Sequence, residues 1–174
     1  MIMAYGDLLE TPFQFIAHQV NCMGVMGAGL AKQITQKYPF IYTEYRNYCA
    51  DWDFSEELLG KAFGVGCNNG HTGHVIYNLF GQYGYGRDKK YTNEAALEEA
   101  LWRMIADIRF EWSQQGNSGI GQICIAIPYG LGCGLAGGDW EIIKRILEKT
   151  EEEYNVIFIA YKYEKKENEC GTFK

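Results

Sequence analysis

Two glycine-rich stretches carry most of the chemistry that this sequence suggests. The first reads Asn21-Cys22-Met23-Gly24-Val25-Met26-Gly27-Ala28-Gly29, and the second runs from Tyr129 to Gly138. Each stretch follows an apolar, strand-like run and precedes a helix-like run. Glycines at such a turn let backbone N–H groups approach a ligand closely, and the helix dipole favours an anion at that end. The pattern indicates a phosphate-binding site, with two purely structural turns as the alternative.

The spacing of the first stretch narrows the class of ligand. It is G-x-x-G-x-G, which differs from the G-x-G-x-x-G fingerprint of dinucleotide-binding turns, and no P-loop lysine follows it. Neither loop core contains a lysine. The two loops together therefore favour recognition of a diphosphate or a phosphorylated sugar by backbone N–H groups.

Composition limits the partners. The chain has 174 residues and a net charge of −6, and we find no basic patch beyond Lys89-Lys90 and residues 162–166. A stable complex with a nucleic-acid polymer is not expected, because such binders carry a basic patch. Aromatic residues make up 15% of the chain, which fits either core packing or a ligand-stacking surface. We expect one domain over residues 1–163, followed by a polar tail over residues 164–174.

Cysteine, histidine and hydropathy patterns predict a reduced cytoplasmic protein without a metal. The six cysteines are scattered without C-x-x-C pairs, and the three histidines lack metal-site spacing. We expect reduced cysteines, with Cys67, Cys124 and Cys133 buried, and neither a metal nor a cofactor. The chain shows no signal peptide and no membrane-spanning apolar run, so no membrane partner is expected.

The elements that must position the two loops follow from hydrophobic periodicity and turn residues. Strands are expected at 1–5, 14–20, 61–67, 74–80, 122–128 and 155–161, and helices at 28–38, 39–50, 93–114 and 139–149. Turn residues at 68–73 predict a hairpin, and 116–121 predicts another turn. This order implies a mixed sheet with helices on both faces. The two loops then meet at the carboxyl ends of strands, where open α/β sheets bind ligands.

Three segments of the chain resemble the macrodomain family. They are Gly6-Asp7-Leu8-Leu9, His18 to Ala31 and Ile127 to Trp140. The sequence is most similar to a branch that holds the yeast ADP-ribose 1″-phosphate phosphatase, the human terminal ADP-ribose glycohydrolase and the antitoxins that reverse DNA ADP-ribosylation. Members also occur in bacteria and bacteriophages. The resemblance implies an α/β fold, a three-layer α/β/α sandwich with a mixed, mostly six-stranded central sheet, which holds ADP-ribose in the crevice.

The resemblance also implies ligand-binding residues. Asp7 would accept a hydrogen bond from the adenine amino group, or it is a plain turn cap. Gly27-Ala28-Gly29 would lie against the pyrophosphate and the distal ribose, and Gly132-Cys133-Gly134-Leu135 would enclose the phosphates from the other side. Tyr161, with Tyr163 as second choice, would flank the adenine, or it is an exposed edge tyrosine.

Asn21 and His18 are the candidate catalytic residues that the resemblance implies. The Asn21 amide would face the distal ribose or an attacking water, and its alternative is a side chain that bonds to loop backbone. His18 would act as a general acid or base, and its alternative is a satisfied core histidine. An offset of three residues puts the two on opposite faces of a strand unless a bend intervenes.

At two positions this sequence lacks the catalytic residue that its relatives in the family carry, which argues against their covalent chemistry here. Members that remove ADP-ribose through a lysine nucleophile carry it where Gln82 stands here, and an amide is not nucleophilic at neutral pH. The human enzyme has an acidic residue where Ala136 stands. Lys89 or Lys90 could supply an amine through a flexible loop, and Asp139 reads as a helix cap.

The segment after the fourth strand is a possible lid. Gln82, Tyr83, Tyr85 and Arg87 would cover the distal end of the crevice, with Arg87 as a phosphate clamp, or the segment is a solvated loop.

The leading hypothesis is a monomeric hydrolase that removes the 1″-phosphate from ADP-ribose 1″-phosphate. A non-catalytic ADP-ribose reader and an ADP-ribosyl glycohydrolase that acts on modified protein or DNA are the alternatives. The expected partner is ADP-ribose or ADP-ribose 1″-phosphate in each case.

Overall fold

A computed structural model describes residues 1–68, 73–114 and 121–164. The expected turns at 68–73 and 116–121 and the expected polar tail at 164–174 lie almost wholly outside these residues. In the part that is described, no helix is both long and apolar enough to cross a membrane.

The strands and helices follow the expected order. The strands are β1 (Ile2–Tyr5), β2 (Phe15–Asn21), β3 (Ala62–Asn68), β4 (Gly73–Gln82), β5 (Ile123–Pro128) and β6 (Val156–Lys162), and the helices are α1 (Gly29–Lys37), α2 (Pro39–Ala50), α3 (Glu94–Gln114) and α4 (Trp140–Tyr154). Two short 3₁₀ turns lie at Leu8–Glu10 and Ser55–Leu58. Pro39 begins α2 because a proline at the first helical position loses no intrahelical hydrogen bond.

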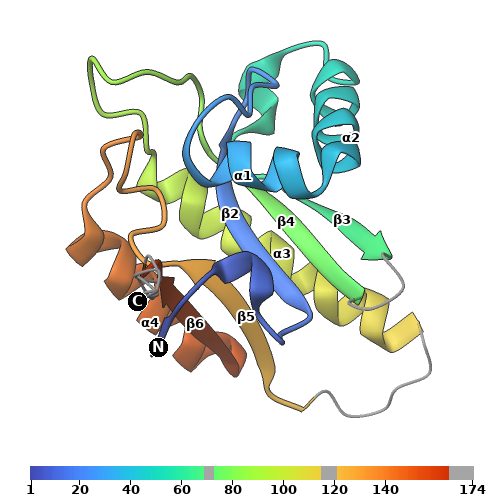
Figure 1. The fold of residues 1–174 in the computed structure, drawn as a ribbon, viewed down its shortest axis with the longest axis vertical. Helices are drawn as coiled ribbons and strands as arrows, with labels where there is room; N and C mark the ends of the chain where they lie inside the picture. The colour runs from blue at the N-terminus through green and yellow to red at the C-terminus, as the bar shows by residue number, and fades with distance from the viewer. Residues whose placement is uncertain (69–72, 115–120, 165–174) are drawn as a thin grey trace, which may run out of the picture.

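The six strands form one mixed sheet in the order β1-β6-β5-β2-β4-β3 (Figure 1). All neighbouring pairs are parallel except β3 and β4, which pair antiparallel from Ala62 opposite Leu79 to Asn68 opposite Gly73. The predicted hairpin pairing and the predicted mixed sheet are therefore confirmed.

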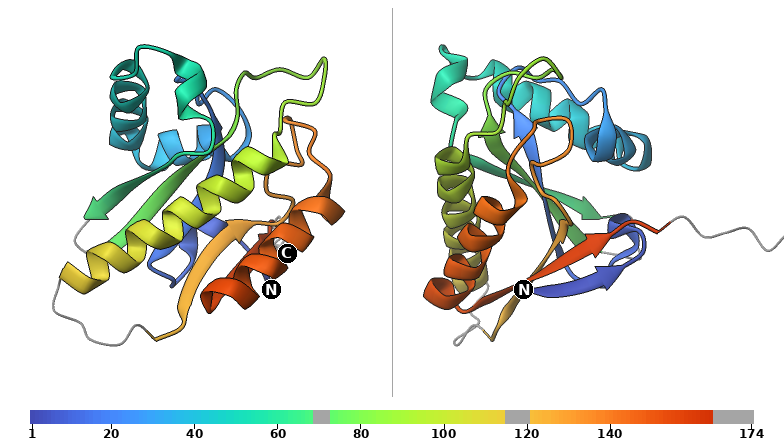
Figure 2. Two further views of the ribbon diagram at one scale, coloured as in Figure 1. Left: turned by 180° about the vertical axis from the view of Figure 1, so that it is seen from behind. Right: turned by 90° about the vertical axis from the view of Figure 1, so that its left-hand side faces the viewer.

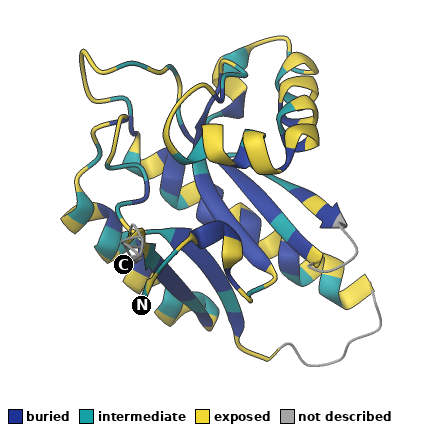
Figure 3. Cartoon of the chain, in the orientation of Figure 1, coloured by how far each residue is buried: buried dark blue, intermediate teal, exposed yellow. Residues whose placement is uncertain are grey.

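Helices cover both faces of the sheet. Figure 2 shows α3 and α4 on one face, with α1 and α2 on the other. The α3 and α4 face buries an apolar stripe of α3 that includes Leu97, Leu101, Met104, Ile105 and Ile108. This stripe has the helical spacing read from the sequence. The strands between the helical layers are mostly buried, whereas the loops at the carboxyl ends of β2, β4 and β5 mix exposed and partly buried residues, and the segment after β4 is the most exposed (Figure 3). The predicted α/β sandwich is confirmed.

The centre of the sheet creates the opening for a ligand. The strands β2 and β5 are parallel neighbours. The helix that follows β2 lies on one face, and the helix that follows β5 lies on the other (Figure 2). The two connecting loops therefore diverge at the same edge of the sheet, and a crevice opens between them.

Candidate functional site

A cleft of about 560 Å³ occupies this position. Its walls come from the end of β2 with the loop after it, the loop after β5, and part of the segment after β4. The lining residues are His18, Gln19, Val20, Asn21, Val25, Gly27, Ala28, Gly29, Leu30, Ala31, Gln82, Tyr85, Gly86, Arg87, Pro128, Gly130, Leu131, Gly132, Gly134, Leu135 and Ala136. Among them Arg87 carries the only side chain that is charged at neutral pH. The cleft therefore presents backbone, apolar groups and amides, with one cation.

The first loop behaves as its glycines predict. Gly27, Ala28 and Gly29 all line the cleft. Ala28 is the N-cap of α1 in an extended conformation, and no side chain caps the helix there. Gly29 has φ +55°, which a residue with a Cβ rarely adopts. The N-terminal N–H groups of α1 are thus left without a side-chain partner at the wall of the cleft, where the dipole favours an anion.

The second loop supplies the opposite wall. Gly132, Gly134 and Leu135 line the cleft, and Gly132 has φ +71°. Cys133 does not line it: its Sγ donates to the carbonyl of Leu131 at 3.4 Å, and its side chain packs against the core. Burial raises the pKa of Cys133 to about 11, so it is a neutral thiol at pH 7. The Cys133 side chain therefore lies behind the loop, and contact of this loop with the phosphates stays a prediction.

Asn21 holds the first loop together. Its Nδ2 donates to the carbonyl of Val25 at 2.7 Å, and its Oδ1 accepts from the N–H groups of Met23 and Val25. The Tyr45 hydroxyl also donates to Oδ1, at 3.1 Å. The structure thus shows the loop-bonding arrangement that the sequence left open. Within the described part of the chain, the Asn21 Nδ2 donates one hydrogen bond and keeps a second N–H for a ligand, and Asn21 lines the cleft.

His18 is buried in the same region. It is 2% exposed, and its Nε2 lies 2.9 Å from Oδ1 of Asn78 on β4. Burial lowers the pKa of His18 to about 4, so the imidazole is neutral at pH 7. The pairing of β2 with β4 shifts register between Gln19 and Asn21, because two residues of β4 stand opposite one of β2. The extra residue belongs to β4 and not to β2, yet His18 and Asn21 of β2 both line the cleft.

Asp7 and Tyr161 lie at the same edge of the sheet but outside the lining of the cleft. Asp7 caps the first 3₁₀ turn, because its Oδ1 accepts from the N–H of Leu9 at 2.9 Å. The Tyr161 hydroxyl accepts from Oγ1 of Thr11 at 2.9 Å. Tyr163 is 65% exposed. Asp7 is therefore a turn cap, whereas Tyr161 is half-buried on an inner strand and is not an exposed edge tyrosine. Any adenine contact of either residue stays a prediction.

The segment after β4 divides into two parts. Tyr85 and Arg87 line the cleft, whereas Tyr83 turns away, with its hydroxyl 3.1 Å from Oγ of Ser55. Gln82 is no lid residue, because it is the last residue of β4, with its side chain at the cleft. Strand β4 runs past its predicted end at residue 80 because its extra residue keeps the chain paired with β2 as far as Gln82.

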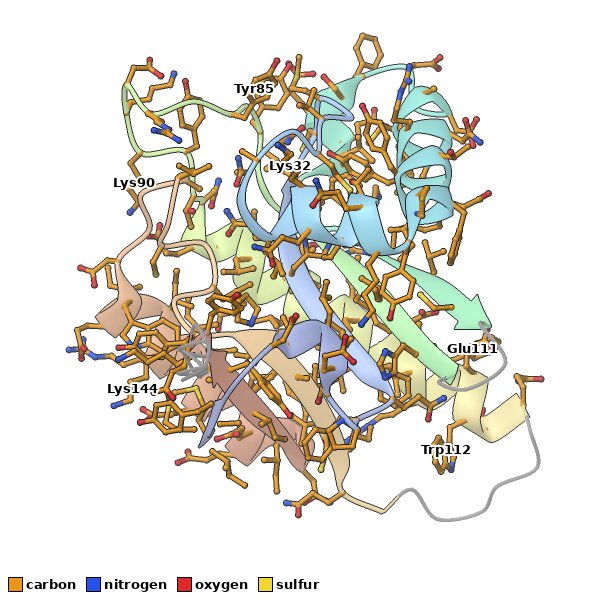
Figure 4. The ribbon with its side chains drawn as sticks, in the orientation of Figure 1. Lys32, Tyr85, Lys90, Glu111, Trp112 and Lys144 are labelled. Atoms are coloured by element: carbon orange, nitrogen blue, oxygen red, sulfur yellow. The ribbon has the colours of Figure 1, made fainter. Side chains whose placement is uncertain are left out.

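Lys89, Lys90 and Asp139, which the sequence offered for covalent chemistry, lie outside the lining of the cleft. Lys90 pairs with Glu94, and Nζ of Lys89 lies over the ring of Tyr91. Neither lysine lines the cleft. Asp139 caps α4, as its Oδ1 accepts from the N–H of Glu141 at 2.9 Å. Figure 4 shows Lys90 and Tyr85 near opposite ends of the segment after β4, with Lys90 beside the second loop.

Sequence reasoning missed Gln19. It lines the cleft and bonds to both Gln82 and Thr92. A polar residue between the buried Ala17 and Val20 gave a signal, but its partners come from distant segments. In the described residues, no cluster of histidine, cysteine, aspartate or glutamate could hold a metal ion. Cys22, Cys49, Cys67, Cys124 and Cys133 are all free, although Cys124 and Cys133 are only half-buried rather than buried.

Comparison with known proteins identifies the fold family. No family model matches the chain. The ADP-ribose 1″-phosphate phosphatase of Aspergillus oryzae is 27% identical, over 87% of this chain and 90% of that protein. The DNA ADP-ribosyl glycohydrolase of Mycobacterium bovis is 30% identical over 82% of this chain, but this chain spans only 36% of that protein. The solved macrodomain of Mycobacterium tuberculosis DarG superposes with a TM-score of 0.69 and 27% identity, over 92% of this chain and 97% of that one.

The chain belongs to the macrodomain family. Its macrodomain fold places the two glycine-rich loops on neighbouring parallel strands, and the cleft lies between them.

Proposed function

We propose that this macrodomain binds ADP-ribose in the cleft and removes the distal phosphate from ADP-ribose 1″-phosphate. One observation carries the proposal: two backbone-lined loops face each other across the cleft, and of the described residues in its lining only Arg87 has a charged side chain. The activity for which the relative from Aspergillus oryzae is named supports the same proposal. The proposed occupant is an anion held mainly by N–H groups.

The N–H groups and Arg87 suit a ligand that has both a pyrophosphate and a terminal phosphate. The pyrophosphate would take N–H groups from the first and second loops and would lie near the N-terminus of α1. A guanidinium binds a terminal phosphate through two parallel hydrogen bonds, so Arg87 would recognise the 1″-phosphate. Among the residues that the structure describes, no carboxylate lines the cleft to repel either group.

Hydrolysis needs water to attack phosphorus while the bond between phosphorus and the C1″ oxygen breaks, which gives ADP-ribose and inorganic phosphate. The second N–H of Asn21 would orient the water or the sugar hydroxyl. His18 is neutral at pH 7, so it would serve as a hydrogen-bond acceptor or weak base rather than as a proton donor. Backbone N–H groups would stabilise the charge that develops on the phosphoryl oxygens.

A comparison of two arginine variants tests the proposal. We expect the protein to release phosphate from ADP-ribose 1″-phosphate, and Arg87→Met to lower kcat/KM about tenfold or more, the usual loss for a charge-assisted contact. Binding of ADP-ribose itself should change much less. Arg103→Met is the matched control, because Arg103 pairs with Glu99 on α3 and lies outside the cleft lining.

Two other outcomes would redirect the proposal. ADP-ribose binding without phosphate release at micromolar enzyme would make the protein a reader. Removal of ADP-ribose from modified DNA would favour the glycohydrolase activity for which the Mycobacterium bovis relative is named. The position of Gln82 at the cleft and of both lysines outside its lining argues against a lysine nucleophile.

A further inference from the structure

Gln19 lies where three parts of the cleft meet. It belongs to β2, opposite Leu79 of β4, at the point where the register between these strands shifts. Its side chain reaches from β2 toward the end of β4, the start of α3 and the second glycine-rich loop. Gln19 is partly buried and lines the cleft.

A single amide group joins these parts. The Nε2 of Gln19 donates to Oε1 of Gln82 at 2.8 Å and to Oγ1 of Thr92 at 2.9 Å. Two further hydrogen bonds continue this network. Nε2 of Gln82 donates to the carbonyl of Gly84 at 2.7 Å, and Oγ1 of Thr92 donates to the carbonyl of Gly132 at 2.6 Å. Both hydrogens of the Gln19 amide are therefore used on residues that flank the segment 83–91.

Backbone contacts bring the same flanks together. Gln82 and Thr92 form an isolated antiparallel bridge, and the N–H of Asn93 donates to the carbonyl of Gly81 at 2.8 Å. The N–H groups of Tyr91 and Thr92 both donate to the carbonyl of Ala136 in the second loop. The segment 83–91 thus leaves and re-enters the fold at one place, and the Gln19 side chain crosses that place.

Two glycines leave the space that Gln19 occupies. A Cβ on Gly132 would lie 2.5 Å from Oε1 of Gln19, and a Cβ on Gly81 would lie 2.7 Å from the same atom. Both distances are shorter than real Cβ contacts. In the described residues this Oε1 is buried without a hydrogen-bond partner. An orphaned acceptor is costly, so global stability alone does not explain the presence of this amide.

We propose that Gln19 is a positioning residue that fixes both ends of the segment 83–91 and so aims Tyr85 and Arg87 into the cleft. The proposal rests on the proposed function for the identity of the ligand. Gln19 acts through Gln82 and Thr92 rather than through the reacting atoms. Its loss would release the cationic clamp while both glycine-rich loops stay in place.

The test replaces Gln19 with methionine, which has a similar length but no donor. In the ligand-free protein we expect faster amide hydrogen exchange in residues 83–92, with a melting temperature close to that of the wild type, because the lost bonds and the removed orphan acceptor offset one another. Gln14→Met makes the same change at the exposed residue before β2 and should leave exchange unchanged. Thr92→Val removes the hydrogen bond from Thr92 to the carbonyl of Gly132, and it should also speed amide hydrogen exchange in residues 83–92.

The second measurement is the energetic coupling between Gln19 and Arg87, obtained from kcat/KM of the single and double variants. We expect Gln19→Met to lower kcat/KM for ADP-ribose 1″-phosphate about tenfold, the loss that corresponds to one or two net hydrogen bonds. Added to Arg87→Met, it should cause little further loss, because the clamp is already gone. Full additivity with Arg87→Met, or unchanged hydrogen exchange in residues 83–92, would overturn the inference. Absence of ligand binding by the wild type would instead overturn the proposed function, and the exchange measurement would still test Gln19.

Discussion

His18 and Asn21 lie on the same strand but have different structural roles. The His18 imidazole is held neutral by burial, whereas the Asn21 amide organises the loop after β2. The sequence indicated both residue types and their loop, but it could not show which hydrogen bonds they make. Those bonds depend on Asn78 and Tyr45, which lie far away in the chain.

Burial of His18 predicts a pH-dependent stability. Its pKa is about 4 in the folded protein and 6.5 ordinarily, so the unfolded chain binds more protons between these values. The contribution is complete above pH 6.5 and is lost as the pH falls toward 4. Urea unfolding at pH 7.5 and 4.5 should show a loss about 2–3 kcal/mol larger for the wild type than for His18→Gln. Equal losses in the two proteins would show that His18 is not the group that titrates.

The hydrogen bonds of the Asn21 amide predict the effect of an isosteric substitution by aspartate. Asn21→Asp keeps the acceptor for Met23 but places an oxygen 2.7 Å from the carbonyl of Val25 in place of a donor. We expect the free energy of unfolding to fall by about 1–3 kcal/mol and ADP-ribose binding to weaken, because the first loop loses its anchor. Urea unfolding and calorimetry measure the two effects. A stable variant with native affinity would contradict this role of Asn21.

At the scale of elements, periodicity predicted the helices and strands to within a few residues. Two ends were predicted too early by two residues or more. Helix α4 runs to Tyr154 instead of residue 149, because it ends only where Asn155 takes a left-handed conformation with φ +45°. Strand β4 runs to Gln82, because an extra residue near Gly81 restores its pairing with β2. Neither a polar helical turn nor a bulge has a clear periodic signal.

The N-cap of α4 offers a prediction at this scale. Asp139→Ala removes the hydrogen bond from the N–H of Glu141 and should lower the free energy of unfolding by about 1 kcal/mol. Because Asp139 does not line the cleft, activity on ADP-ribose 1″-phosphate should be unchanged. Thermal unfolding and a phosphate-release assay measure the two quantities. A large loss of activity in the folded variant would instead assign Asp139 to the site.

The whole molecule carries a net charge of −6, yet the ligand that we propose for its cleft is an anion. Both properties hold because the attraction comes from N–H groups and one arginine rather than from a basic surface. The sequence indicated this combination, because both loops are rich in glycine and neither loop core contains a lysine. It did not predict that Cys133 would face the core, or that Gln19 would join the segments around the cleft.

This balance predicts a weak dependence of ADP-ribose affinity on salt. Screening weakens the contact with Arg87, but it also weakens the long-range repulsion between an acidic protein and an anionic ligand. We expect less than about a threefold change in Kd between low and physiological ionic strength, because the two effects oppose each other. Calorimetric titrations at the two salt concentrations check this. A tenfold loss would indicate a cationic site outside the cleft described here.

Calorimetric titration with ADP-ribose, for the wild type and Gly132→Ala, tests most directly the claim that the cleft between the two loops holds the ligand. An alanine at position 132 must adopt φ +71° and would place its Cβ 2.5 Å from Oε1 of Gln19. Gly66→Ala, where the added Cβ meets nothing within 4 Å, is the matched control. The account predicts saturable one-to-one binding by the wild type and by Gly66→Ala, and a strong loss for folded Gly132→Ala. No binding by the wild type, or native affinity in Gly132→Ala, would contradict it.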